Sequence, residues 1–160
     1  MLHIILSALT MAYRNPKTNT VEVYSDDTTC ILRRPCTLAD QDLPDIATLH
    51  MRQQKQKASA LRYKKEIQGV DTPHGRISTD RESQMMLANT IAFVTAQPQD
   101  VVWKKEDGTF VTLTHADLAN VATIVLHHVE SCFRQEAAVV ESLLAAEDVT
   151  KVDVEAHFNQ

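Results

Sequence analysis

The sequence of 160 residues is poor in the residue types that mark several specialised classes of protein. Three glycines and five prolines are too few for a collagen-like or broadly disordered chain. Aromatic residues make up only 5%, so we expect a core of aliphatic side chains. The apolar stretch at residues 2–9 is shorter than the about 20 residues of a membrane-spanning helix, and it lacks the basic segment and cleavage site of a signal peptide. We therefore expect a globular protein made in a cytoplasm, with a strand at residues 2–9.

Cysteine is also scarce. The three cysteines, Cys30, Cys36 and Cys132, are an odd number, and their spacing matches no disulfide framework. A chain of this length does not need disulfides for stability, and cytosolic proteins rarely contain them. We expect free thiols, with a disulfide between Cys30 and Cys36 as the alternative.

The net charge of −5 is distributed unevenly along the chain. Residues 1–70 carry ten Lys or Arg against seven Asp or Glu, whereas residues 71–160 carry six against fourteen. Non-specific binding to nucleic acid depends on a high density of cations, so we do not expect it in the C-terminal half. The two halves are expected to have different partners.

Residues 1–43 are predicted to form a small β-meander. Apolar runs at residues 21–24 and 29–32 alternate with turn residues, notably at 15–19. Strands this short rarely stand alone, so we expect them to pair with the main domain or with another chain. We interpret residues 1–43 as an attachment segment.

Residues 44–69 are predicted to form a basic linker helix, because no glycine or proline interrupts the stretch between Pro44 and Gly69. Its basic side chains are a candidate surface for an acidic partner: Arg52, Lys55, Arg62, Lys64 and Lys65. A solvated linker helix is the favoured alternative, because charge runs without interleaved aromatic residues are usually solvated faces. A third possibility is that this helix packs on the acidic half of a neighbouring subunit.

Residues 70–146 are predicted to fold as a helix, a β-hairpin and a second helix. Residues 70–77 are interpreted as a turn-rich linker. Thr79 and Glu82 have the spacing of a capping box, and Asp80 and Glu82 suit the positive end of a helix dipole. The helix that follows is expected to end at Gln97, because Pro98 follows it.

The hairpin is predicted from Asp107 and Gly108, which lie between two apolar runs. If these two residues form the whole turn, Trp103 lies opposite Thr112 and diagonal to Phe110. The two rings would then share one face of the hairpin, covered by helices.

The second helix is predicted to begin at Thr114, with Asp117 completing a capping box, and to run for about 30 residues. One apolar stripe is expected to face inward: Leu118, Ala122, Val125, Val129, Cys132, Val139 and Leu143. Further apolar residues fall outside this stripe and form a candidate subunit interface: Ile124, Leu126, Phe133, Val140 and Leu144. Residues 147–160 form an acidic tail.

No motif for catalysis, metal binding or a cofactor is recognisable. His127 and His128 are adjacent, whereas two metal ligands on one helix should be three or four residues apart. Cys132 lies four residues after His128, but on the apolar stripe, where a cysteine usually acts as a small hydrophobic side chain. We expect neither an enzyme, nor a metal, nor a cofactor.

Three stretches in this order, residues 77–84, 102–113 and 128–138, resemble a small domain of unassigned function found in tail-fibre and tail-fibre-assembly proteins of tailed phages and prophages. The resemblance covers about residues 70–146 and does not extend to residues 1–69. It marks a structural signature: Thr79, Asp80, Arg81, Glu82, Trp103, Asp107, Gly108, Phe110, Thr114 and Asp117.

The resemblance implies a structural component of a bacteriophage tail that attaches or organises fibres or baseplate through protein contacts. The expected fold is α+β, the expected partners are other tail or fibre proteins, and the expected assembly is a homo-oligomer, with a trimer favoured. Its expected location is the virion tail, after assembly in the bacterial host cytoplasm, without a membrane. One alternative is a cytoplasmic chaperone for tail-fibre assembly, and a second is a nucleic-acid-binding regulator that uses the basic helix.

Overall fold

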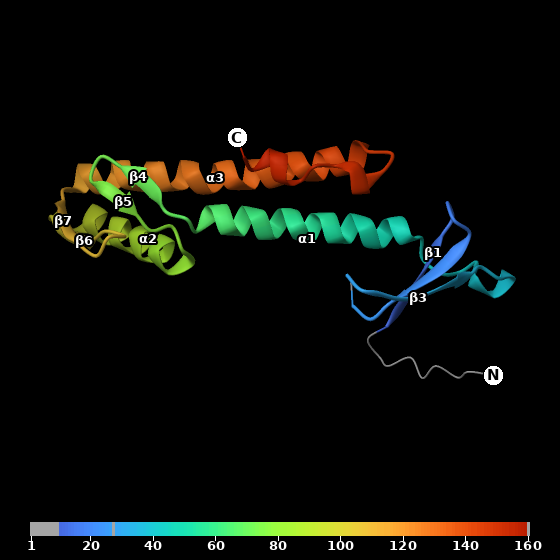
Figure 1. The fold of residues 1–160 in the computed structure, drawn as a ribbon. Helices are drawn as coiled ribbons and strands as arrows, with labels where there is room; N and C mark the ends of the chain where they lie inside the picture. Colours follow the sequence, from blue (N-terminus) through green and yellow to red (C-terminus); the bar gives the residue numbers. More distant parts are fainter. Residues whose placement is uncertain (1–9, 27, 160) are drawn as a thin grey trace. The chain divides into compact units, whose positions relative to one another are not determined.

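The computed structural model describes residues 10–26 and 28–159, and in these residues the fold is α+β (Figure 1). A small β-meander comes first and helices follow, as the sequence predicts. The strand predicted at residues 2–9 lies outside the described residues. The chain divides into two compact units, which we describe separately. The N-terminal unit comprises Met1–Lys57 and Val140–Val154, and the hairpin unit comprises Ala58–Val139 and Glu155–Gln160.

In the N-terminal unit, three antiparallel strands form a sheet in the order β1-β2-β3. The strands are β1 (Met11–Asn15), β2 (Thr20–Tyr24) and β3 (Cys30–Pro35). Strand β1 was not predicted from the sequence. The turn after it is held by the Asn15 side chain, whose oxygen accepts from the backbone N–H of Lys17 at 3.1 Å. Asn19 completes the turn with a φ of 54°, a left-handed conformation that asparagine tolerates.

The sheet of the N-terminal unit packs on the first turns of α1 (Ile46–Glu66). Tyr13 and Tyr24 meet edge to face with ring centroids 6.0 Å apart, and Ile46 and Leu49 complete this small core. Tyr24 also donates its hydroxyl to the buried carboxylate of Glu22 at 3.1 Å. Burial, together with this carboxylate, raises the pKa of Tyr24 to about 12. The N-terminal meander therefore has its own hydrophobic and polar packing.

In the hairpin unit, the segment interpreted as a linker is a short β-hairpin. Its strands are β4 (Val70–Thr72) and β5 (Gly75–Ile77). Gly75 has a φ of 102°, which only glycine adopts readily, and the Thr72 hydroxyl donates to its carbonyl at 2.7 Å. Strands of three residues are too short to show the alternation of apolar and polar side chains that identifies a strand. The turn residues of this segment therefore led to the prediction of a linker.

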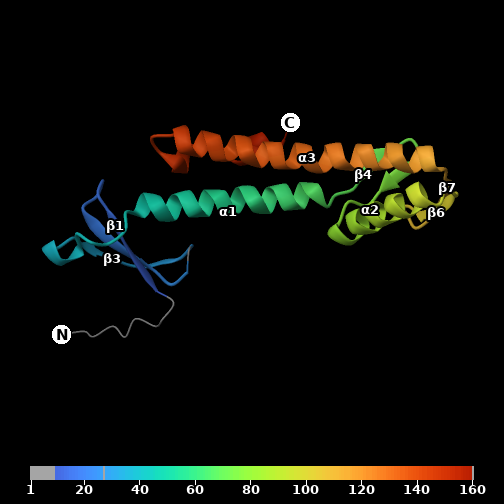
Figure 2. The same cartoon turned by 180° about the vertical axis from the view of Figure 1, so that it is seen from behind.

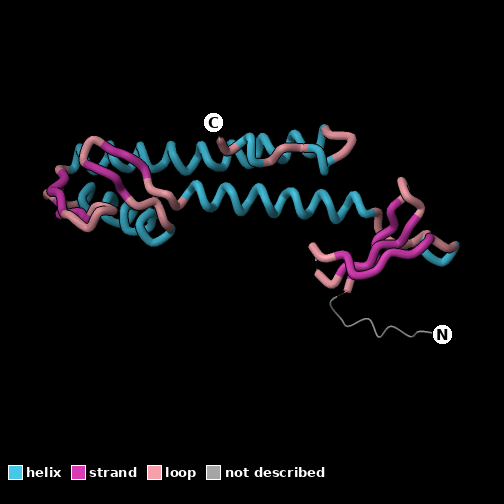
Figure 3. The backbone as a smooth tube through the Cα atoms, viewed as in Figure 1, coloured by secondary structure: helices cyan, strands magenta, loops and turns pink. Residues whose placement is uncertain are grey.

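The remaining elements of the hairpin unit follow the predicted order (Figures 2 and 3). They are α2 (Arg81–Ala96), β6 (Val101–Lys104), β7 (Phe110–Leu113) and α3 (His115–Ala145). Two 3-10 turns come after α3, at Val149–Lys151 and Glu155–His157. In Figure 2 α2 lies beside the first turns of α3. Between them is the core, formed by Ile77, Leu87, Val94, Trp103, Leu113, Leu118, Val121 and Val125.

The turn between β6 and β7 is longer than predicted. Lys105 donates its backbone N–H to the Thr109 carbonyl at 2.8 Å, and Gly108 donates to the Lys105 carbonyl at 3.0 Å. Of the loop residues only Gly108 has a positive φ, 83°, whereas a two-residue type I′ turn needs positive φ at both central positions. Asp107 instead accepts the Thr109 N–H on its side chain at 2.9 Å. The loop is thus a turn followed by a one-residue bulge.

This extra residue changes the faces of the hairpin. Trp103 lies opposite Val111 rather than Thr112. A shift of one residue moves every side chain to the other face, so Trp103 is buried whereas Phe110 is 68% exposed. The prediction that the two rings share one face is wrong.

Candidate functional site

A buried polar cluster surrounds the last turn of α1 in the hairpin unit. We call it the α1 C-terminal cluster, and it consists of Arg62, Glu66, Thr79, Arg81, Gln84, His128 and Glu136. These residues come from α1, the start of α2 and the middle of α3.

The Glu66 carboxylate is the centre of the cluster, and its residue is only 1% exposed. It accepts a hydrogen bond from Arg62, lies 3.1 Å from Arg81 Nε and accepts from the Gln84 amide at 3.3 Å. Arg62 uses its Nε to bind Glu136 at 2.8 Å. A buried carboxylate is tolerated when it is paired and hydrogen-bonded in this way, and removing one partner is strongly destabilising. Arg81 of the predicted signature therefore helps to neutralise a buried charge.

The backbone end of α1 is held by two side chains. The Glu66 carbonyl accepts the hydroxyl hydrogen of Thr79, and the same hydroxyl oxygen accepts the Gly69 N–H at 3.0 Å. His128 Nε2 lies 3.2 Å from the carbonyl oxygens of both Lys65 and Glu66. Because a carbonyl only accepts, Nε2 carries a hydrogen. Both contacts satisfy carbonyls that a helix leaves unpaired at its C-terminus.

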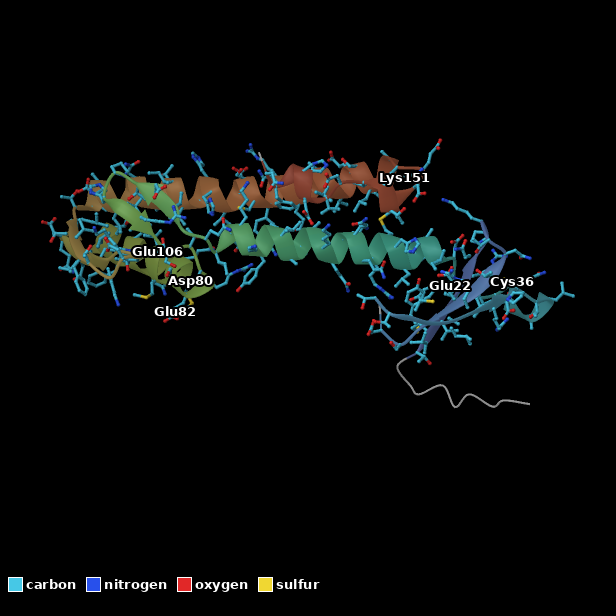
Figure 4. The ribbon with its side chains drawn as sticks, viewed as in Figure 1. Glu22, Cys36, Asp80, Glu82, Glu106 and Lys151 are labelled. Atoms are coloured by element: carbon cyan, nitrogen blue, oxygen red, sulfur yellow. The ribbon has the colours of Figure 1, made fainter. Side chains whose placement is uncertain are left out.

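Asp80, rather than Thr79, caps the start of α2. Its carboxylate accepts from the Ser83 N–H at 2.9 Å and from the Ser78 hydroxyl at 2.6 Å, and these hydrogen bonds lower the pKa of Asp80 to about 2. The prediction that Thr79 caps α2 in a capping box with Glu82 is therefore wrong. The cap is one residue later, at Asp80, because the Thr79 hydroxyl bonds to the end of α1. Glu82 is exposed in the first turn of α2 (Figure 4).

The capping box at the start of α3 has the predicted residues. Asp117 accepts the Thr114 N–H at 3.0 Å, and Thr114 accepts the Asp117 N–H on its hydroxyl oxygen at 3.2 Å. The Thr114 hydrogen bonds lower the pKa of Asp117, and His74 adds a contact at 3.2 Å. This part of the signature has a structural role.

The residues of the candidate subunit interface differ in exposure. Leu126 is 64% exposed and Leu144 67%, whereas Ile124 and Val140 are partly buried. Phe133 is 46% exposed, and the Arg62 guanidinium carbon lies 4.5 Å from its ring centre. Leu126 and Phe133 belong to the hairpin unit, and Val140 and Leu144 to the N-terminal unit.

Leu126 borders a shallow groove between α2 and α3 in the hairpin unit. We call it the α2–α3 groove; its volume is about 270 Å³. Its lining is almost entirely apolar and consists of Gln84, Leu87, Ala88, Ile91, Ala122, Val125, Leu126 and Val129. A second depression, of about 520 Å³, lies between the start of α2 and the β6–β7 hairpin and includes the exposed side chains of Met86, Val102 and Phe110. The hairpin unit thus presents apolar side chains to solvent in two places.

The candidate basic surface is smaller than predicted. Arg62 is only 9% exposed and binds Glu66 and Glu136, so it is not part of a binding surface. Lys65 donates to the Phe158 carbonyl at 2.9 Å, and Arg52 donates to the Tyr13 hydroxyl at 2.7 Å. Lys55 and Lys64 are exposed.

Cys132 is buried, and burial raises its pKa, which disfavours a reactive thiolate. Cys30 and Cys36 are also free thiols. Within residues 10–26 and 28–159, no three His, Cys, Asp or Glu side chains are grouped so that they could hold a metal ion. No helix in this part of the chain is long and apolar enough to cross a membrane.

A family model described as a domain of unknown function, DUF4376, matches residues 50–156. The chain belongs to this family. No curated protein and no solved structure shows significant similarity to the chain. The DUF4376 match begins in α1 rather than at residue 70, so it includes Arg62 and Glu66 and with them the whole α1 C-terminal cluster.

Four members of this cluster, Glu66, Gln84, His128 and Glu136, were not predicted as site residues from the sequence. One signal was present: Arg62 and Glu66 are four residues apart, the spacing of an ion pair on one helix face. The contacts that join α1 to the rest of the cluster link residues 13 to 74 positions apart, which no local pattern reveals.

Proposed function

We propose that this protein is a structural component of a bacteriophage tail, which attaches or organises fibres or baseplate by binding other tail proteins. The observation that carries the proposal is the α2–α3 groove with the 64% exposed Leu126 beside it. Apolar side chains gathered around a groove are typical of protein-binding surfaces. The sequence resemblance to tail-fibre and tail-fibre-assembly proteins supplies the phage context.

The proposed assembly is a homo-oligomer, with a trimer favoured, located in the virion tail after assembly in the host cytoplasm. The buried polar cluster supports a rigid platform rather than a reactive site, because each of its charged groups is engaged by a neighbouring side chain. Among the remaining signature residues, Asp80, Thr114 and Asp117 cap helices, and Asp107 and Gly108 shape the hairpin turn. These residues determine the shape of the surface.

Oligomerisation is tested with the full chain by light scattering at micromolar concentration. Leu126→Glu places a charge beside the groove and is expected to reduce the measured mass to that of a monomer. His127→Glu is the matched control, because His127 is exposed on the next position of α3, and it is expected to retain the wild-type mass. A wild-type monomer, or equal masses for the two variants, would contradict the proposed assembly.

The virion location is tested separately by mass spectrometry of purified phage particles. A tail component is expected in stoichiometric amount relative to fibre protein. Its absence from particles, with retention of fibre binding in the host extract, would identify a cytoplasmic assembly chaperone instead. The nucleic-acid alternative has less support, because Arg62 and Lys65 are engaged within the hairpin unit.

A further inference from the structure

Two arginines of the N-terminal unit share one face of the sheet but differ in their contacts. Arg14 in β1 and Arg34 in β3 are both opposite Val21 in β2, and directly opposite residues lie on the same face. Arg34 binds the Asp40 carboxylate through both terminal nitrogens, at 2.7 and 2.6 Å. This two-pronged contact lowers the pKa of Asp40.

Arg14 has no such partner among the described residues. Its Nε is buried and has no hydrogen-bond acceptor, and its guanidinium makes no ion pair in this part of the chain. Nearly all buried polar groups in proteins are hydrogen-bonded, so a buried guanidinium nitrogen without an acceptor calls for an explanation. The two terminal nitrogens of Arg14 are not buried and also have no acceptor among the described residues, and a guanidinium fork of this kind matches a carboxylate.

The space beside Arg14 suits such a ligand. A cavity of about 410 Å³ is lined by Arg14, Asn19, Cys36, Thr37, Leu38 and Gln41. Arg14 is the only charged residue in this lining. The side-chain amides of Asn19 and Gln41 add hydrogen-bond donors, and neither makes a hydrogen bond elsewhere in the described residues. Cys36, which follows β3, is labelled in Figure 4.

We propose that this cavity, the Arg14 pocket, binds the carboxylate of an aspartate or glutamate side chain that a partner protein presents next to an apolar residue. Leu38 supplies the apolar contact, because it lines the pocket and is 86% exposed. A cavity of this size is larger than a single ion needs and has room for a side chain together with the residue next to it. The inference rests on the proposed function only for the source of the carboxylate, which would be a neighbouring tail protein.

The stability of two variants tests whether Arg14 lacks an internal partner. Arg14→Gln is expected to leave the melting temperature of the full chain unchanged or to raise it, because it removes an unpaired group. Arg34→Gln is the matched control and is expected to lower the melting temperature, because Asp40 loses its partner. Equal losses for the two variants would show that Arg14 is already paired and would overturn the proposal.

Binding is tested by titrating the full chain with sodium acetate while chloride keeps the ionic strength constant. The NMR signals of Arg14 Nε–H and the Gln41 side-chain amide are expected to shift and saturate. Arg14→Gln should abolish the Gln41 response, whereas Arg134→Gln, which removes an exposed arginine of the other unit, should preserve it. If the Arg14 Nε–H signal shifts no more than the Arg134 Nε–H signal, the Arg14 pocket does not bind carboxylates and the proposal is overturned. This outcome is independent of whether the protein is part of a phage tail.

Two peptides identify the source of the carboxylate. Acetyl-Leu-Glu-Leu-amide is expected to bind on the order of tenfold more tightly than acetate, because its leucine packs on Leu38. Acetyl-Leu-Gln-Leu-amide, which has the same shape without the charge, is expected not to bind. Equal affinity for acetate and the glutamate peptide would reject a protein partner and indicate a small carboxylate ligand.

Discussion

Thr79→Val removes one hydroxyl from the α1 C-terminal cluster and leaves the size of the side chain nearly unchanged. Thr79 is fully buried, and its hydroxyl joins the Glu66 carbonyl to the Gly69 N–H. Valine can neither donate nor accept. The Glu66 carbonyl keeps the His128 ring as a donor, but the Gly69 N–H loses its acceptor.

The size of the effect follows from these two losses. An unpaired buried N–H costs about 1–3 kcal/mol, and the lost hydrogen bond to the carbonyl contributes about 0.5–1.5 kcal/mol. We expect Thr79→Val to lower the free energy of unfolding by about 3 kcal/mol. Thr79→Ser keeps the hydroxyl and is expected to cost about 1 kcal/mol for the missing methyl group.

Trp103 makes the measurement specific to the hairpin unit. It is the only tryptophan of the chain and is buried in the core of that unit, so its fluorescence in a urea titration reports the unfolding of that core. Thr90→Val is the control, because the Thr90 hydroxyl bonds only within α2, to the Met86 carbonyl; its expected change is within about 0.5 kcal/mol. Equal urea midpoints for Thr79→Val and Thr90→Val would refute the role assigned to Thr79.

Three further predictions concern the helix cap, the turn and the thiols. Because the pKa of Asp80 in the folded protein is about 2, below its ordinary value of 3.8, its charge stabilises the fold above pH 4, and this contribution is lost as the pH falls from about 4 to about 2. Asp80→Asn, which keeps a capping oxygen, should lack this part of the pH dependence when unfolding is followed by Trp103 fluorescence. Gly108→Ala should lower the unfolding free energy by about 1 kcal/mol in urea, from backbone strain alone, because no atom lies within 4 Å of an added Cβ. In native protein a thiol reagent should label the exposed Cys30 quickly and the buried Cys132 only on unfolding, as read by mass spectrometry of peptides.

Each of these predictions has a result that contradicts it. Parallel pH profiles for wild type and Asp80→Asn would show that the Asp80 charge does not stabilise the fold. Gly108→Asn should cost less than Gly108→Ala, because asparagine tolerates positive φ; the reverse order would argue against the assigned turn. Rapid labelling of Cys132 in native protein would mean that its helix face opens readily.

Local chemistry in the sequence was sufficient for the helices of the hairpin unit. The reciprocal contacts of Thr114 and Asp117 need only a spacing of three residues, and Pro98 ends α2 because the residue before a proline disfavours the helical conformation. The inward stripe of α3 was also readable, since Leu118, Val125, Cys132, Val139 and Leu143 are all buried. These features depend on neighbours within one or two helical turns.

The sequence by itself therefore determined the α+β class, the three helices and the hairpin of β6 and β7, but not β1, β4 and β5. Tertiary structure decided the rest. The sequence predicts that Thr79 caps α2, but its hydroxyl bonds to the Glu66 carbonyl at the end of α1. The sequence predicts that Arg62 is a surface cation, but it is buried and binds Glu66 and Glu136. Phe110 changed face because one bulge residue shifted the register of the hairpin. The contacts of Thr79 with Glu66 and of Arg62 with Glu136 join residues 13 and 74 positions apart, and the register of the hairpin depends on the backbone angle of Gly108. Neither kind of determinant leaves a periodic pattern in the sequence.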